Sequence, residues 1–157
     1  MEPPAAAGEV GTTPVPRRIR TPTGFLMVLR QGDDVFAQLE ALMVEEAVPS
    51  ASFVGFGFLR RATFGFYDFD RREYRPRSFE QLELANMTGT LAWKQGQPSV
   101  HAHGVAGDAG FATVGGHLLG LEVGTGSLEI TVTLHERRLE RETDPVIGAN
   151  ILSLRPG

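Results

Sequence analysis

The chain has 157 residues, of which 41% are hydrophobic, and this composition suits one globular domain with a packed core. It contains no cysteine, which excludes disulfides and thiolate chemistry, so any metal site must use nitrogen and oxygen ligands. Nineteen acidic residues against fifteen basic ones give a net charge of -4, a balance that disfavours nucleic acid as the main ligand.

The N-terminal segment predicts a flexible tail over residues 1–23, because it is rich in Pro, Ala, Gly and Thr. Residues 24–157 are then expected to form a single domain. The start of the chain lacks the basic and apolar regions of a secretory signal, and no apolar run approaches the roughly 20 residues of a membrane span. We therefore expect a cytoplasmic protein with no membrane partner.

The first elements are predicted to be a buried strand at residues 25–29 and an amphipathic helix directly after it. Asp33 is expected to be the N-cap of the helix, and Pro49 is expected to end it. Apolar residues recur between these limits at spacings of three and four, which is typical of a helix that packs on a sheet.

The next stretch alternates glycine with large apolar residues at 54–58 and is predicted to be a strand that continues to Asp68. The glycine face implies a close backbone approach or a bulge. A phosphate-binding loop is disfavoured, because this Gly-x-Gly lacks a following helix start and a basic partner. Residues 70–77 carry four arginines and are predicted to form an exposed turn, either as solvated charge or as a patch for an anionic partner.

Further strands are predicted around residues 82–93, 128–134 and 150–154, with a turn at 94–97. The expected total is about six or seven strands, mostly antiparallel, and one principal helix packed on the sheet. This is an α+β fold.

Three of the four histidines form the most informative pattern. His101 and His103 lie two residues apart, so a strand places both imidazoles on the same face. A glycine-rich turn follows, and a hairpin centred near Gly110 brings His117 opposite His103, with Cβ atoms about 4.5–5.5 Å apart. Three converging imidazoles suit a divalent metal, with zinc as the first candidate, and leave one coordination position open.

The surroundings of this pattern allow several expectations. Gly115 and Gly116 are expected to leave room beside the site and to permit a bulge that re-aims His117. Three carboxylates are candidate partners for the metal-binding imidazoles: Glu122, Glu129 and Asp108. The fourth histidine, His135, is expected to be an ordinary exposed residue near a strand end. The plainer alternative is that all three histidines lie on a solvated face and bind only water or one another.

Five short motifs in this order resemble those of the plants-and-prokaryotes-conserved domain family, also known as a domain of unknown function that is fused to AT-hooks in land plants. They are residues 54–58, 64–68, 87–90, 101–103 and 115–118, and the resemblance covers about residues 25–154. It implies an α+β homotrimer and a divalent metal at His101, His103 and His117.

Two functions follow as hypotheses. The first is a small trimeric protein with a three-histidine metal site that binds a small-molecule ligand or has a metal-dependent activity still to be assigned. The second is a DNA-binding or transcription-associated module, after the naming of many prokaryotic members. Residues 16–20 lack the Arg-Gly-Arg-Pro core with which an AT-hook enters the minor groove, so DNA is the less favoured partner.

Overall fold

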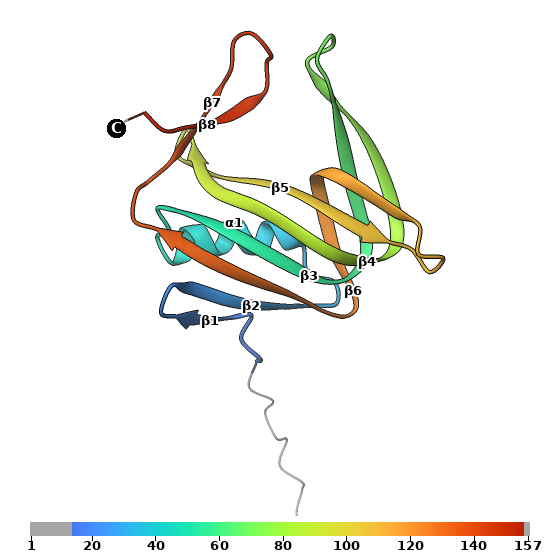
Figure 1. The fold of residues 1–157 in the computed structure, drawn as a ribbon. Helices are drawn as coiled ribbons and strands as arrows, with labels where there is room; N and C mark the ends of the chain where they lie inside the picture. Colours follow the sequence, from blue (N-terminus) through green and yellow to red (C-terminus); the bar gives the residue numbers. More distant parts are fainter. Residues whose placement is uncertain (1–13, 156–157) are drawn as a thin grey trace, which may run out of the picture.

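The computed structural model of the protein describes residues 14–155 (Figure 1). Most of these residues lie in strands, several of them long, in which buried and exposed side chains tend to alternate. This part of the chain forms eight strands and one helix. The elements in chain order are β1 (Arg18–Thr21), β2 (Gly24–Arg30), α1 (Val35–Glu45), β3 (Ser50–Asp68), β4 (Glu73–Lys94), β5 (Gln97–Gly107), β6 (Thr113–His135), β7 (Glu140–Thr143) and β8 (Asn150–Ser153).

The strands form one mixed sheet in the order β1-β2-β6-β3-β4-β7-β8. Strand β5 pairs with both β4 and β6, so β3, β4, β5 and β6 make a closed circuit of hydrogen-bonded strands. All pairings are antiparallel except the one between β4 and β7 at Trp93 and Glu140. The predicted sheet is thus confirmed as largely antiparallel, but the described residues contain eight strands and only a short helix, so the fold is mostly β.

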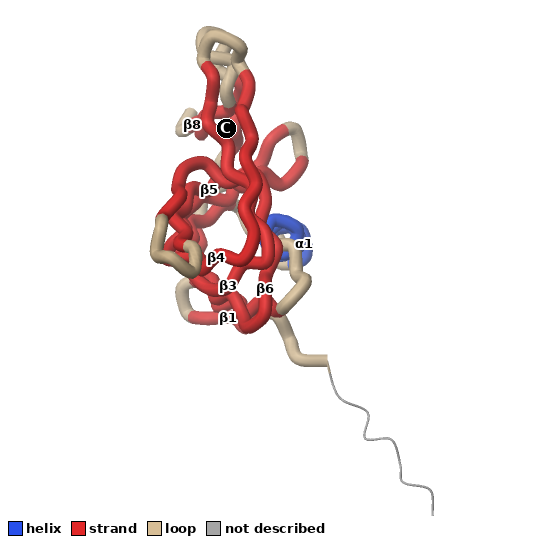
Figure 2. The backbone as a smooth tube through the Cα atoms, turned by 90° about the vertical axis from the view of Figure 1, so that its right-hand side faces the viewer, coloured by secondary structure: helices blue, strands red, loops and turns tan. Residues whose placement is uncertain are grey.

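Helix α1 lies against one face of the sheet, as Figure 2 shows, and it buries Val35, Leu39, Leu42 and Met43 there. Its N-cap is Asp34, whose side chain accepts a hydrogen bond from the Ala37 amide. The predicted N-cap was wrong by one residue, because Asp33 instead binds Arg17 and the backbone amide of Arg30. The helix ends at Glu45, before Pro49.

The predicted tail was wrong over residues 18–23, because β1 pairs with β2 along its whole length. Arg18 also donates hydrogen bonds to Glu45 and Glu46 at the end of α1, and Arg20 binds Glu46 as well. These contacts hold β1 in place, although its polar composition alone does not predict a strand. The first part of the predicted tail, residues 1–13, lies outside the described residues.

The glycine face of β3 is confirmed as a place of close backbone approach. A Cβ at Gly57 would lie 2.4 Å from the carbonyl oxygen of Ser127 on β6, and the residue has a φ of 148°. The register with both neighbouring strands shifts at this point. The glycines face the packed side of the strand, so Val54, Phe56 and Phe58 lie on its exposed side.

The arginine-rich segment was only partly predicted. The turn ends at Arg72, and β4 begins at Glu73, so Arg75 and Arg77 are strand residues rather than turn residues. Strand β4 therefore starts nine residues before the predicted strand, and it forms with β3 the long arm that projects from the sheet in Figure 1. Within residues 14–155, no helix is both long and apolar enough to cross a membrane.

Candidate functional site

Successive side chains of β5 point to opposite faces of the strand, and this determines where its two histidines lie. Ala102 is buried and Val100 packs against the core, so His101 and His103 lie on the opposite face of the strand. His103 pairs directly with His117 of β6, and the hairpin is centred on Gly110 as predicted. His117 also pairs with Gly65 of β3, so it lies where β6 passes from one partner strand to the next.

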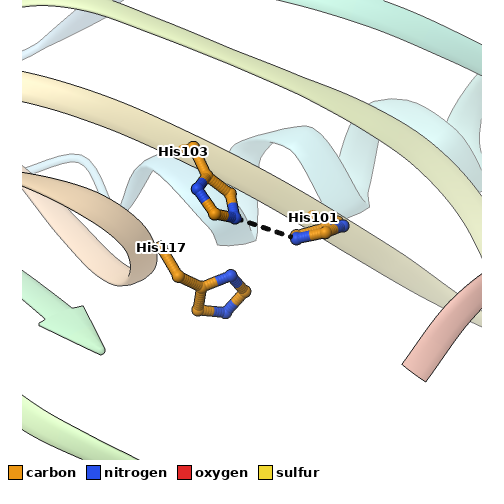
Figure 3. A group of neighbouring side chains, drawn as sticks. All are labelled: His101, His103 and His117. Carbon is orange, nitrogen blue, oxygen red and sulfur yellow. Dashed lines mark hydrogen bonds between the residues drawn. The ribbon is translucent and has the colours of Figure 1, made fainter. Parts of the chain in front are cut away.

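The three imidazoles converge, which confirms the predicted geometry (Figure 3). The Nε2 atoms of His101 and His103 are 3.3 Å apart, and the ring centroids of the three pairs are 5.1 to 5.2 Å apart. One nitrogen of each ring lies within 4.8 Å of the others. In Figure 3 a ring nitrogen of His117 points toward the other two rings. Metal binding by these residues stays a prediction.

The surroundings favour the neutral form of two of these rings, because they lower the pKa of His117 and of His101. Burial, together with the nearby His101 and His103, lowers the pKa of His117 to about 4. Burial also lowers the pKa of His101, and the positive charge of Arg141 adds to that effect ahead of His103. A neutral imidazole is the form that binds a metal ion, so the site does not have to lose these protons first.

The carboxylates predicted to support the histidines do not do so. Glu122 forms an ion pair with Arg60, because both lie on the exposed side of the β3–β6 pair. Asp108 accepts hydrogen bonds from amides of its own turn. Glu129 lines a different cavity. Among the described residues, no carboxylate is hydrogen-bonded to any of the three imidazoles.

Tyr74, which sequence reasoning missed, stacks on the ring of His117. The two rings are stacked with centroids 4.2 Å apart and an angle of 11° between their planes. The Nδ1 atom of His117 is buried and has no hydrogen-bond partner among the described residues. Tyr74 lies in the part of β4 that was predicted to be turn, so the sequence offered no signal for this contact.

The glycines near the site act differently from the prediction. The β5–β6 register continues without a shift through Gly115 and Gly116, so no bulge occurs there. The extra residue is Leu119, which the shift between β3 and β6 leaves unpaired. The predicted room is confirmed at Gly116, where a Cβ would meet no heavy atom within 4 Å apart from its chain neighbours. The prediction was wrong at Gly115, where a Cβ would lie 2.9 Å from the carbonyl oxygen of Gly104.

A further glycine, Gly89 of β4, lets β5 approach closely behind the histidines. A Cβ there would lie 2.3 Å from the carbonyl oxygen of His101 and 2.5 Å from the ring of Phe53. The fourth histidine lies apart from this site. His135 is an exposed residue at the end of β6, as predicted, and its Nε2 is 2.9 Å from the Ser52 hydroxyl.

A groove of about 550 Å³ opens beside His103 and His117. Its walls are mainly aromatic, with two arginines that lie over rings of the same wall. The guanidinium of Arg75 is 5.4 Å from the Phe66 ring centroid, and that of Arg77 is 5.0 Å from the Phe79 ring centroid. The site can therefore offer an apolar surface to a small molecule next to the converging nitrogens.

The chain belongs to the Plants and Prokaryotes Conserved (PCC) domain family, whose model matches residues 19–135. This confirms the family resemblance seen in the sequence. No curated protein is similar enough to the chain to count as a match.

Among solved structures, the chain is 57% identical to a "putative DNA-binding protein" from Ralstonia eutropha, with a TM-score of 0.86 over 88% of this chain and 96% of that one. It is 31% identical to a metal-containing protein from Archaeoglobus fulgidus, with a TM-score of 0.75 over 82% and 93% of the two chains. A "putative DNA binding protein" from Bacteroides thetaiotaomicron is 25% identical, with a TM-score of 0.81 over 87% and 95%.

Proposed function

We propose that this PCC-domain protein binds a divalent metal ion, with zinc as the first candidate, through His101, His103 and His117, and that a small molecule binds beside the ion. The observation that carries the proposal is the convergence of the three imidazoles. Tetrahedral zinc with Zn–N distances of 2.0–2.1 Å places its nitrogen ligands about 3.3 Å apart. The Nε2 atoms of His101 and His103 have this separation.

The chemistry of the donor set fits such an ion. Neutral imidazoles suit zinc and other first-row divalent metals, and the chain has no thiolate to offer instead. The buried Nδ1 of His117 has no hydrogen-bond partner within residues 14–155, and a buried polar atom is costly unless something binds it. The 31% identical protein from Archaeoglobus fulgidus, described as metal-containing, supports the same conclusion.

When bound, such an ion supplies a Lewis acid with a coordination position free for a small molecule. The chain's own residues hold the three rings in place: the β5–β6 pairing fixes His103 and His117, and Tyr74 stacks on His117. The aromatic groove offers space for the small molecule. No carboxylate of the described part contacts the imidazoles as a proton acceptor, so we propose binding and assign no reaction.

Metal analysis of protein purified without a histidine tag tests the proposal. After incubation with zinc and removal of excess, we expect about one ion per chain. His101→Ala should abolish binding while the oligomer stays intact, and His135→Ala, which removes a histidine outside the site, should leave the metal content unchanged. Less than about a tenth of an ion per chain in the wild type would overturn the proposal. An unchanged metal content in His101→Ala would show that the histidines bind only one another.

We also propose that the protein is a homotrimer, as the family resemblance implies. The supporting observation is the exposed side of β3, where Val54, Phe56 and Phe58 are 51%, 55% and 44% exposed in the single chain. Contiguous apolar surface of this kind marks protein contacts. Sedimentation should give about 51 kDa, three times the 17.0 kDa chain, and Phe56→Glu should lower this mass. A monomeric wild type would contradict the trimer.

A DNA-associated module is the second candidate, favoured by the 57% identical neighbour described as a "putative DNA-binding protein". The arginines near the N-terminus give it little support, because Arg17 and Arg18 form ion pairs with Asp33 and with the end of α1. Phosphate contacts would make binding fall steeply with salt. No shift of a labelled duplex by micromolar protein at ~50 mM salt would exclude this candidate.

A further inference from the structure

Arg141 of β7 is an arginine in an unusual position. Its relative exposure is only 6%, and it is the only charged residue in the described part of the chain that is buried. Its Nη2 donates hydrogen bonds to the hydroxyl and carbonyl oxygens of Thr90, while its Nε has no acceptor among the residues that the structure describes. No carboxylate within residues 14–155 pairs with it. Arg141 also lies beyond residues 19–135, which match the family model.

The guanidinium lies beside the three-histidine site. Thr90, which Arg141 contacts, is the direct cross-strand partner of His101 in the β4–β5 pair. Side chains of such partners are neighbours on one face of the sheet. The charge of Arg141 also acts on His101, since it helps to lower the pKa of that imidazole.

A buried guanidinium without an anion is costly, because the desolvated charge is compensated only by dipoles. Burial lowers the pKa of Arg141 for this reason. Two arginines outside this region do have carboxylate partners: Arg60 of β3 pairs with Glu122, and Arg17, just before β1, pairs with Asp33. Because no carboxylate of residues 14–155 compensates the charge of Arg141, the geometry suits a ligand that brings its own negative charge.

We propose that Arg141 binds the carboxylate of a small organic acid held at the three-histidine site. This inference rests on the proposed metal site and names the class of its ligand. The low exposure of Arg141 favours a small anion over a nucleic-acid backbone, because a bulky polymer has less access to an enclosed side chain. The groove on the other side of the site, with its aromatic walls, suits the apolar remainder of such an acid. Arg141 is thus a specificity residue for the ligand.

The test uses Co²⁺-loaded protein, in which the visible spectrum of the ion reports on binding beside it, and acetate as the probe. Acetate should change the spectrum of the wild type, whereas acetamide, its neutral analogue, should change it only at concentrations at least ~10-fold higher. Arg141→Met should weaken acetate binding at least ~10-fold and leave Co²⁺ uptake intact. Arg138→Met, which removes an exposed arginine paired with Glu140, should leave acetate binding unchanged.

The other outcomes overturn one claim or the other. If the wild type takes up no Co²⁺, the metal site is wrong and this inference falls with it. If Co²⁺ binds but acetate binds equally well to the wild type and to Arg141→Met, the metal site stands and the proposed role of Arg141 is wrong. A lower melting temperature of the variant would then show only a structural role for Arg141. If inorganic phosphate binds more tightly than acetate in an Arg141-dependent way, the carboxylate class is wrong. Should Arg141→Met fail to fold, Arg141→Lys serves instead, and it should still weaken acetate binding because lysine has no Nε–H donor of this kind.

Discussion

The zinc affinity of the three-histidine site should fall by at most about 100-fold between about pH 7.5 and pH 5.5. Zinc must displace any proton from its ligands, and an imidazole with an ordinary pKa would lower the affinity about 10-fold over this interval. Three such imidazoles would give about 1000-fold. His117, with a pKa of about 4, is neutral throughout the interval and contributes almost nothing. The lowered pKa of His101 reduces the fall further.

The assay is competition with a chromophoric chelator whose own proton binding is known, repeated across the pH interval. Tyr74→Ala provides a matched comparison, because it exposes the stacked face of His117 to water and so raises the pKa of that imidazole toward its usual value. The variant should show a steeper fall than the wild type, by up to about 10-fold. A wild-type loss of about 1000-fold, or identical slopes in the two proteins, would refute this reasoning.

Three further predictions concern the metal-free protein and its core. Because folding depresses the pKa of His117 below its usual value of 6.5, stability is full above this pH and declines as the pH falls toward about 4. Allowing for solvent screening of a half-buried ring, the loss is about 1–2 kcal/mol, and thermal unfolding that is flat with pH over this interval would contradict it. Gly89→Ala places a methyl group against the carbonyl oxygen of His101, so it should lower the free energy of unfolding by about 1–3 kcal/mol and weaken metal binding. Gly120→Ala, with no heavy atom within 4 Å of its added Cβ apart from its chain neighbours, should change neither quantity. Chemical denaturation and metal titration measure the two effects. Trp93→Phe removes the indole N–H that donates to the buried carbonyl oxygen of Val48, so it should lower the free energy of unfolding by about 1–3 kcal/mol. Denaturation followed by circular dichroism measures this value, and an unchanged value would contradict a stabilising role for the Trp93–Val48 hydrogen bond.

The histidine hairpin could be predicted because two local rules determine it. A period of two fixes the shared face of His101 and His103, and a turn centred on Gly110 fixes the partner of His103. Neither rule depends on the rest of the fold. The same alternation also identified the strand around residues 128–134 as half-buried, and it forms the end of β6.

The elements that were missed depend on tertiary contacts. Strands β1 and β7 are short and mostly polar, so no apolar pattern marks them, and β1 is held by pairing with β2 and by ion pairs to α1. The first nine residues of β4 are mostly exposed and none is fully buried, so they show no regular alternation of apolar and polar side chains. Arg141 lies beside Thr90, the cross-strand partner of His101, because β7 pairs with β4 at Trp93 and Glu140, and no spacing in the sequence indicates this pairing.

His117 lies where β6 pairs with both β5 and β3. Metal binding by this residue would therefore depend on correct pairing of all three strands. A slip of one residue in either pairing would turn this imidazole to the opposite side, away from its two companions. An ion that needs all three nitrogens would then select molecules in which both ladders have formed correctly. Metal uptake during refolding would therefore report that β6 has paired in the correct register with both β5 and β3.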